Sequence, residues 1–493
     1  MPATQDPISQ AIVGAVIVGV FVLLTLEKAH RVLVIFSAVG LLWLVTYLTP
    51  YHLISFEEAH RHLDLNVILL LASMMAIVGV LKTTGVFEWA VARIVTRSRG
   101  VPSVLQSRVI WLTGVLSALV DNVTTVLFMY PMAAGMAAAT AIPAAVLLLP
   151  MIVASNIGGA ATLIGDPPNI LIGSGAGLSF TDFIVNLTMP VLWMMAACIA
   201  FSRRYYRTHL EAHRPAASAQ PSADGAPVIT NPLLLKWGLA IAGLVFVGFM
   251  THSMTHMPVA VPALIGAAAL LVVQDVLYLR RRDATEQERA HGILTIIERE
   301  IEWPTLAFFA FLFITVGAAV ETGLIDTMAG GLIGLIESGR TTLGLSETGT
   351  LLFAAVLVLW VSGVLSALVD NIPYVAVAIP LVARLVDGLT GDVEVLWWAL
   401  ALGACLGGNG SAIGASANVT VIGMADRAGS PISFREFLRF GAAITTITLL
   451  ISTAFVAAHL YAGQRTTFLA GSAALILFGA WKALRPRLQS PRL

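Results

Sequence analysis

Long apolar segments alternate with short polar connections along almost the whole chain. Most of these segments approach the roughly 20 residues that an α-helix needs to cross a bilayer. Backbone polar groups must be satisfied inside a membrane, so the segments are expected to be helical. The pattern therefore predicts an all-α polytopic membrane protein. The predicted segments are 11–27, 32–49, 65–81, 104–120, 123–139, 143–164, 185–202, 233–251, 259–279, 303–320, 350–369, 372–388, 396–412, 439–460 and 467–482.

One polar interruption of this pattern occurs twice. Residues 113–122 read TGVLSALVDN and residues 362–371 read SGVLSALVDN, which are identical at nine of ten positions. Each copy ends in an Asp-Asn pair, Asp121-Asn122 or Asp370-Asn371, after which the apolar pattern resumes. A carboxylate inside a membrane segment is costly and is a functional hypothesis by default. Two such pairs at matching places in two halves point to a binding site at a repeat interface.

The duplication extends over most of the chain and sets the predicted domains. Residues 84–85 match 322–323, the Gly-rich stretch 156–169 matches 405–418, and 179–180 match 433–434. Internal repeats of this kind are typical of secondary transporters. We predict a first membrane repeat over 1–202, a linker over 203–231, a second repeat over 232–460, and an extra C-terminal transmembrane helix with a tail over 461–493.

The distribution of Lys and Arg predicts the orientation. Basic residues gather in alternate connections, among them 93–108, 203–214 and 280–299. Cytoplasmic loops carry the excess of Lys and Arg, so we expect a multi-pass protein of the cell (inner) membrane with its N-terminus outside and its linker and C-terminus in the cytoplasm. The second repeat is then inverted relative to the first. This topology requires each Asp-Asn segment to be a re-entrant hairpin. Each Gly-rich stretch interrupts an otherwise apolar segment and is expected to break a transmembrane helix.

The two hairpin tips carry most of the candidate chemistry. The second helix of each hairpin begins at the tip, so its free N–H groups and positive dipole end point into the cavity. An ionised Asp offsets that charge and can hold a cation or a proton, which makes a sodium site at each Asp-Asn pair a candidate. The alternative is that both aspartates only cap their helices. Thr124 and Thr125 could add hydroxyl ligands, whereas Pro373 and Tyr374 replace them in the second copy.

The two Gly-rich stretches add further candidates. Glycine permits unwinding, and freed carbonyl groups can bind an ion; the alternative is close packing of small residues between helices. Asp166 has no counterpart carboxylate, because Ala415 matches it, and its place before two prolines suits either capping or ligation. The candidate residues of the two stretches are Asn156, Gly158, Gly159, Thr162, Asp166, Asn169, Gly407, Gly408, Asn409, Ser411 and Asn418.

Composition excludes several classes of protein. Hydrophobic residues make up 58% of the chain and charged residues 11%, far from the roughly half and quarter of a soluble protein. The formal net charge is zero and no basic block is available for nucleic acid. The two cysteines, Cys198 and Cys405, both lie in apolar segments and form no metal-binding pattern. No nucleotide-binding loop, catalytic triad or zinc motif is found, so we expect neither an enzyme nor a cofactor.

The motifs at 120–125, 156–162 and 164–169, with 403–410 and 413–418 in the second half, resemble those of the ArsB/NhaD transporter family of the ion transporter superfamily. Within that family they are most similar to the bacterial permeases related to melanosomal P protein. The resemblance covers roughly residues 20–460. It implies a scaffold domain, a moving transport domain with two hairpins and often a homodimer. In the related carboxylate transporters the tips carry Ser-Asn-Thr, where this chain carries Asp-Asn.

Together these patterns predict a secondary active transporter of a small inorganic ion, coupled to protons or cations through the two hairpin aspartates. Arsenite or antimonite efflux and sodium–proton antiport are the leading activities. An anion (chloride or carboxylate) transporter or channel and a membrane scaffold with a relic site are the alternatives. The expected partners are the lipid bilayer, the small ion and a coupling proton or sodium ion. A homodimer and a cytoplasmic ATPase are further candidates, and no nucleic acid is expected.

Overall fold

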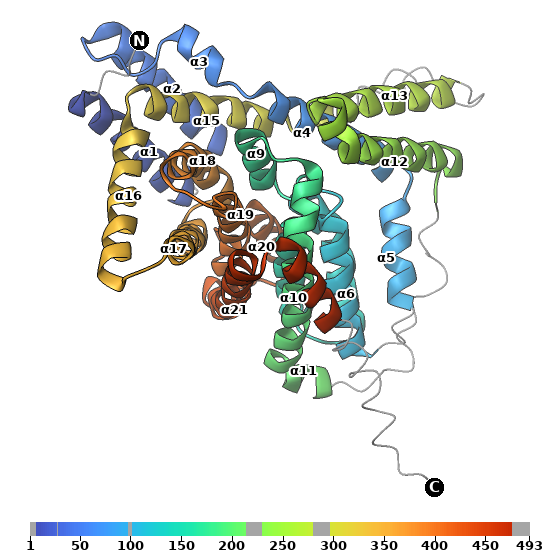
Figure 1. Ribbon diagram of the computed structural model, residues 1–493. Coiled ribbons are helices and arrows are strands. Elements are labelled where there is room, and N and C mark those ends of the chain that lie inside the picture. The colour runs from blue at the N-terminus through green and yellow to red at the C-terminus, as the bar shows by residue number, and fades with distance from the viewer. Residues whose placement is uncertain (1–5, 27, 97–100, 213–228, 280–295, 476–493) are drawn as a thin grey trace.

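The computed structural model describes residues 6–26, 28–96, 101–212, 229–279 and 296–475 (Figure 1). These residues form helices, turns and loops, and within these ranges none forms a strand. Ten of the described helices are long and apolar enough to cross a membrane. The predicted fold class is confirmed: the protein is all-α, with two inverted-topology repeats that each contain a helical hairpin and a broken helix.

The helices follow the same order in both halves. The first half contains α1 Pro7–Leu26, α2 Arg31–Leu48, α3 Phe56–His62, α4 Leu65–Lys82, α5 Val86–Thr96, α6 Pro102–Ser117, α7 Asn122–Ala139, α8 Ala145–Gly159, α9 Pro167–Ala176, α10 Phe180–Tyr205 and α11 Arg207–Ala212. The second half contains α12 Pro232–Thr255, α13 Ala260–Leu279, the π-helical turn η2 Ile296–Glu300, α15 Trp303–Glu321, α16 Leu324–Leu343, α17 Glu347–Leu368, α18 Asn371–Gly388, α19 Val395–Gly407, the 3₁₀ turn η3 Gly408–Gly410, α20 Ser416–Arg427 and α21 Phe434–Ala462.

Two matching helices, α5 and α16, were not among the predicted apolar segments. Both are amphipathic, so their apolar residues form one stripe and not a continuous run. Each follows a Thr-Gly pair at the end of the preceding helix. The glycines there, Gly85 and Gly323, have φ of 73° and 72°, in the left-handed region that glycine adopts at no steric cost. The sequence match 84–85 with 322–323 therefore marks the same sharp turn in both repeats.

The two halves are intertwined. The helices α12 and α13, which open the second half, pack against α4 of the first, while α1 and α2 pack against α15 of the second (Figure 1). Polar contacts fix both crossings: the Asn66 Oδ1 accepts from the Ala260 N at 3.0 Å, and the Gln10 Nε2 donates to the Thr322 O at 3.1 Å. Each repeat therefore begins with a helix pair that covers the other repeat.

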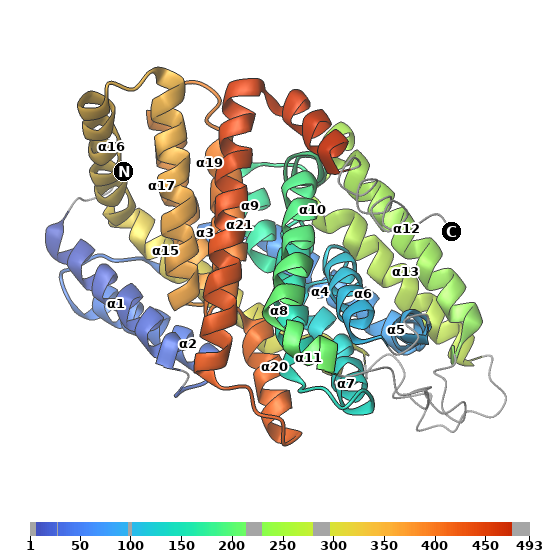
Figure 2. The same cartoon turned by 90° about the horizontal axis from the view of Figure 1, so that it is seen from below.

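The two Asp-Asn segments fold back as hairpins. In the second copy the Tyr374 hydroxyl lies 2.8 Å from the Ser362 hydroxyl, although a continuous helix would carry these residues far apart. The hairpin α6–α7 packs against α8 and the hairpin α17–α18 packs against α19. Between the hairpins, α21 lies beside both α17 and α10 (Figure 2). This arrangement places the two tips on either side of the broken helices.

Close helix contacts hold each hairpin against its broken helix. A Cβ atom on Gly158 would overlap the backbone of Gly114, and a Cβ atom on Gly407 would overlap the backbone of Gly363. Beside these contacts the Ser117 hydroxyl donates to the Ser155 carbonyl at 2.7 Å, and in the second repeat the Ser366 hydroxyl donates to the Ala404 carbonyl at 2.6 Å. These glycines therefore serve close packing, which was the alternative to ion binding in the sequence.

Each broken helix also packs against the other repeat's hairpin. The second half of the first broken helix, α9, lies against α18, and its counterpart α20 lies against α7. The Tyr130 hydroxyl of α7 donates to the Met424 carbonyl of α20 at 2.9 Å. A Cβ atom on Gly175 of α9 would lie 2.6 Å from the Ile379 side chain of α18. The hairpins and broken helices thus form one cross-linked core.

The structure changes two predicted boundaries. The predicted linker 203–231 begins inside α10, which continues to Tyr205, and α11 covers Arg207–Ala212. Residues 213–228 of that linker lie outside the described residues. The predicted C-terminal helix 467–482 is described only in part: residues 464–475 are helical, and 476–493 lie outside the described residues. The Trp193 Nε1 donates to the Gly471 carbonyl at 3.3 Å and fastens this helix to α10.

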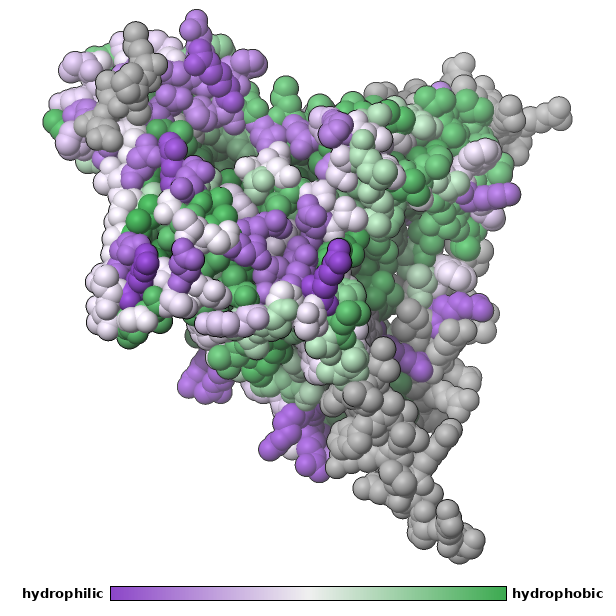
Figure 3. All heavy atoms as spheres, viewed as in Figure 1, coloured by the Kyte–Doolittle hydropathy of each residue, from purple (hydrophilic) through white to green (hydrophobic). Residues whose placement is uncertain are grey.

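Apolar side chains cover the outer face of α12 and α13 (Figure 3). Trp237, Leu244 and Ile265 on these helices are exposed by 50%, 70% and 63%. In a soluble protein so large an apolar surface would drive association. On helices long enough to cross a bilayer it is suited to contact with lipid chains.

Candidate functional site

Four helices begin at one place in the centre of the core. They are α7, α9, α18 and α20, the second halves of the two hairpins and the two broken helices. Residues from the start of each line one cavity of about 200 Å³. A helix N-terminus carries free N–H groups and a partial positive charge. Three of the four N-cap residues are aspartates, Asp121, Asp166 and Asp370, and the fourth is Ala415.

Asp166 joins the two hairpin tips. Its Oδ1 accepts from the Asn122 Nδ2 at 3.2 Å, and its Oδ2 accepts from the Asn371 Nδ2 at 3.4 Å. Its side chain makes no capping hydrogen bond to α9. The residue is 1% exposed, and no ion pair among the described residues involves it. From the sequence, Asp166 could either cap α9 or bind an ion. The geometry does not support capping and instead places the carboxylate between Asn122 and Asn371.

A chain of buried amides connects the repeats behind Asp166. Asn122 donates to the Asn156 Oδ1 at 3.1 Å, and the Asn156 Nδ2 donates to the Oδ1 atoms of Asn409 and Asn418 at 2.9 and 3.1 Å. These asparagines are 0–3% exposed. Buried polar groups need such partners, because an unpaired one costs about 1–3 kcal/mol. The network therefore fixes the tip of the first hairpin to the broken helix of the second repeat.

Asp121 and Asp370 do cap their helices. The Asp121 Oδ1 accepts from the Thr124 N at 2.8 Å, and the Asp370 Oδ1 accepts from the Ile372 N at 3.1 Å. Capping uses one carboxylate oxygen in each case. The Asp370 Oδ2 also accepts from the Ser416 hydroxyl at 2.8 Å. Both aspartates also line cavities, Asp121 the cavity at the first tip and Asp370 the cavity at the second.

The asparagines that end the Gly-rich stretches satisfy carbonyl groups at the helix breaks. The Asn169 Nδ2 lies 2.9–3.4 Å from the carbonyl oxygens of Gly159, Ala160 and Thr162. The Asn418 Nδ2 donates in the same way to Gly408 and Ser411 at 2.7 and 2.9 Å. These contacts occupy carbonyl groups that the sequence had suggested as ion ligands.

Hydroxyl groups in the two stretches bind back to the hairpins. The Thr162 hydroxyl donates to the Ala118 carbonyl at 2.6 Å, and the Ser411 hydroxyl donates to the Ala367 carbonyl. The two acceptors lie just before the hairpin tips. Thr125 is also buried, and its hydroxyl lies 3.4 Å from the Val120 carbonyl. These three side chains therefore shape the tips from behind, whereas Thr124 lines the cavity itself.

Two cavities lie at the two tips and differ in charge. The cavity of about 200 Å³ at the first tip is lined by the carboxylates of Asp121, Asp166 and Glu302. The cavity of about 180 Å³ at the second tip is lined by Asp370. Arg31 at the start of α2 lines both cavities. In the described residues no group of three or more His, Cys, Asp and Glu is placed to hold a metal ion.

Sequence reasoning missed Arg31, Glu302 and Ser416 as site residues. Arg31 directly precedes the predicted segment 32–49, in a short connection that also holds Lys28, and such a basic residue bears first on orientation. Glu302 precedes a predicted span, which is a common place for a solvated charge. Ser416 matches Pro167 of the first repeat, so a comparison of the two halves finds no repeated polar residue at this position. One signal was available: Arg31 and Glu302 each begin an apolar segment, where a charge reaches a cavity more easily than from its middle.

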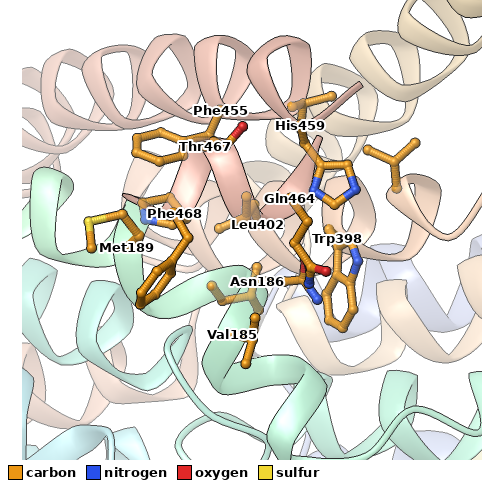
Figure 4. A pocket seen from close by; sticks show the side chains of 14 residues that line it. Val185, Asn186, Met189, Trp398, Leu402, Phe455, His459, Gln464, Thr467 and Phe468 are labelled. Carbon is orange, nitrogen blue, oxygen red and sulfur yellow. The ribbon is translucent and has the colours of Figure 1, made fainter. Parts of the chain in front are cut away.

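A further cavity lies away from the tips, between α10, α19, α21 and the C-terminal helix (Figure 4). Two of its polar side chains have partners: the Gln464 Nε2 donates to the Asn186 Oδ1 at 2.7 Å, and the His459 Nε2 lies 3.1 Å from the Asp392 Oδ2. Apolar side chains such as Phe455 and Phe468 form much of the remaining wall. This cavity is therefore a crevice where the C-terminal helix packs against the core.

Comparison with known proteins relates the chain to membrane transporters. The chain is 38% identical to the "uncharacterized transporter Mb2703" of Mycobacterium bovis over 90% of this chain and 96% of that protein. It is 28% identical to the human P protein over 92% of this chain, which spans 60% of that longer protein. The crystal structure of the Alcanivorax borkumensis YdaH transporter has the same fold, with a TM-score of 0.54, 17% identity, and coverage of 88% of this chain and 99% of that one. The model of the CitMHS citrate transporter family matches residues 21–403, and the chain therefore belongs to this family of membrane transporters.

Proposed function

We propose that this chain is a secondary active transporter that couples the movement of a small inorganic ion to a proton or a cation, with Asp166 at the centre of the coupling. The observation that supports this most directly is the buried Asp166 carboxylate, which accepts one hydrogen bond from each hairpin tip. A buried carboxylate without an ion-pair partner is costly unless a proton or cation joins it. Intramembrane acids of this kind mark proton and ion pathways.

The two hydrogen bonds suggest how ion binding changes the tips. An ionised carboxylate has only acceptors, and both of its oxygens can bind an amide N–H group. A protonated carboxyl group has become a donor on one oxygen, so the contact with one of Asn122 and Asn371 weakens. A cation on the carboxylate competes for the same oxygen atoms. Occupancy of Asp166 thus changes how firmly the two tips are held together, and a ligand with different affinity for two states shifts their populations.

The charges favour a small cation or proton as the coupling species. Four carboxylates, Asp121, Asp166, Asp370 and Glu302, line the two cavities against the single guanidinium of Arg31. Sodium–proton antiport needs no ligand beyond these carboxylates. Arsenite and antimonite are substrates that the resemblance to the ArsB/NhaD family suggests. Either would bind as a neutral hydroxide through amide groups. Binding by three thiolates is excluded, because the chain has two cysteines.

A second candidate is transport of a carboxylate anion. The family name points to citrate, and four helix N-termini and Arg31 are groups at the site that an anion could bind. Flux assays on the purified full chain in proteoliposomes distinguish the two, with an imposed pH gradient and with sodium, arsenite, citrate or chloride as substrate. We expect saturable flux of sodium or arsenite that depends on the gradient. Uptake of citrate, without flux of sodium or arsenite, favours the second candidate. Chloride flux that does not depend on the gradient favours a channel.

Substitution of the tip aspartates tests their part in coupling. Asn is nearly isosteric with Asp and remains a competent cap, so Asp121→Asn and Asp370→Asn are expected to express normally. We expect Asp121→Asn to lower gradient-driven flux about tenfold or more and Asp370→Asn to lower it less, because the first cavity holds the larger share of carboxylates. Flux at several pH values and sodium concentrations provides the measurement. Unchanged pH and sodium dependence in both variants would leave the aspartates as caps alone.

Cysteine labelling tests the proposed orientation. Lys and Arg concentrate in 203–231 and after Lys482, so both segments are expected in the cytoplasm. A single cysteine introduced into 213–228 should react with an impermeant thiol reagent only after the cells are opened. A cysteine in the connection between α16 and α17, at 344–346, should react in intact cells and is the matched control. The reverse labelling pattern would show that the protein has the opposite orientation in the membrane.

A further inference from the structure

Arg31 reaches the second hairpin tip through one hydroxyl group. The Arg31 Nη1 donates to the Ser416 Oγ at 3.0 Å, and the Ser416 hydroxyl donates to the Asp370 Oδ2 at 2.8 Å. A hydroxyl can accept and donate at once, so the two contacts form a continuous chain. Arg31, Ser416 and Asp370 also line the same cavity. The guanidinium therefore balances the charge of Asp370 without contacting it directly.

Among the residues that the structure describes, the first tip has no equivalent of this chain of hydrogen bonds. Pro167 stands at the position of Ser416 and has no hydroxyl group to relay a contact. The second helix of the matching pair in the other half, α13, begins at Ala260, which is uncharged. Arg31 borders the first cavity too, yet its hydrogen bond is directed to the second tip. Arg31, the positively charged side chain that lines both cavities, is therefore linked to Asp370 through Ser416.

We propose that Arg31 is a tethered cation that permanently occupies the second ion position, so that only the first tip takes an exchangeable proton or cation. This inference rests on the proposed function, because it assigns the number of coupling ions to the same site. The duplicated Asp-Asn pairs would otherwise predict two equivalent positions. The arginine removes that equivalence and sets the stoichiometry at one coupling ion in each cycle.

Removal of the guanidinium should restore a second ion position. In Arg31→Met the Asp370 carboxylate keeps the Ser416 hydroxyl as a neighbour but loses the positive charge that balances it. Asp370 is half-buried and lines a cavity, so a carboxylate left there without its balancing charge attracts a counter-ion. The carboxylate and hydroxyl oxygens at that place are ligands that a proton or a hard cation can use. Arg31→Lys retains a positive charge on a side chain that can still reach the cavity.

The test counts coupling ions in proteoliposomes that contain the purified full chain. The flux is measured against pH and against sodium concentration, and the reversal potential gives the charge moved in each cycle. We expect a Hill coefficient near 1 for the wild type and Arg31→Lys, and near 2 for Arg31→Met, with one more charge per cycle. Arg340→Met removes a surface arginine that pairs with Glu337 and is the matched control. Its Hill coefficient should equal that of the wild type.

The outcomes separate this inference from the proposed function. A coupled wild type with an unchanged Hill coefficient in Arg31→Met overturns the tethered cation and leaves the proposed function standing. Wild-type flux without any proton or sodium dependence overturns both. If Arg31→Met is too unstable to purify, Arg31→Met/Asp370→Asn is measured, since neither charge is then left unbalanced. Recovery of folded protein with a Hill coefficient near 1 supports the proposal, and failure to recover overturns it.

Discussion

Replacement of Asp166 by Asn is expected to abolish coupled transport while the protein still inserts and folds. The change removes the one carboxylate that both tips share, and an amide can neither take up a proton nor hold a cation by charge. We expect gradient-driven flux to fall by about two orders of magnitude, the effect typical of losing a positioned proton-transferring group. An Asn side chain offers one acceptor oxygen, so one of the contacts with Asn122 and Asn371 is lost, at a cost of about 1–3 kcal/mol.

Asp64→Asn is the matched control for this variant. Asp64 caps α4 through a hydrogen bond from the Val67 N at 3.1 Å and lines neither tip cavity. Asn caps nearly as well as Asp, so transport by the control should equal that of the wild type. Proton and sodium dependence of flux in proteoliposomes is measured for both variants. Retention of the wild-type pH profile in Asp166→Asn would show that the coupling group lies elsewhere.

The second large effect is expected from the glycines that bring each hairpin against its broken helix. In Gly158→Ala and Gly407→Ala the new methyl group would overlap the backbone of Gly114 and Gly363. A flexible side chain could move aside, but a helix backbone cannot. Overpacking costs about 1–3 kcal/mol and sometimes more. We expect little or no folded protein after purification from either variant, because the contact lies in the fully buried core.

Two other glycines provide controls for the effect of a methyl group on a helix. Gly135 in α7 and Gly423 in α20 have no atom within 4 Å of an added Cβ. Alanine is the better helix former by about 1 kcal/mol, so these variants should be neutral or slightly stabilised. The yield of monodisperse protein and its thermal unfolding temperature are measured for all four variants. Normal stability of Gly158→Ala and Gly407→Ala would mean that the two helices can separate at this contact.

The sequence alone was sufficient to predict the hairpins, the broken helices and their duplication. Membrane segments must satisfy their own backbone hydrogen bonds, so a polar pair inside an apolar run has few structural outcomes. The copies at 113–122 and 362–371 then identified the tips, and the asparagines around them were found to form one network. The predicted segments end within a few residues of the observed helices in most cases. The amphipathic helices α5 and α16 were missed because only one face of each is apolar.

The parts that could not be predicted depend on contacts between the repeats. Asp166 lies 205 positions before Asn371, and no periodicity in the chain relates them. Comparison of the halves even drew attention away from Asp166, because its counterpart is Ala415. Arg31 belongs to a helix pair that crosses to the other repeat, and that crossing is a property of the packed structure. Symmetry in the sequence therefore located the site and showed Asp166 as an exception to it, whereas the contacts of Asp166 with both tips and the place of Arg31 beside the cavities depend on the packed structure.

The crossed packing of the two halves has a consequence for biosynthesis. Asp166 and Asn122 enter the membrane with the first half, but Asn371 and the α20 helix are synthesised about 200 residues later. At roughly 5–20 residues per second the ribosome needs about 10–40 s for that interval. During this time the first hairpin and α9 lack the helices that cover them, and their polar groups have no partner from the second half. The nascent first half is therefore expected to stay with the insertion machinery, and the two halves made as separate chains should yield stable protein only when co-expressed.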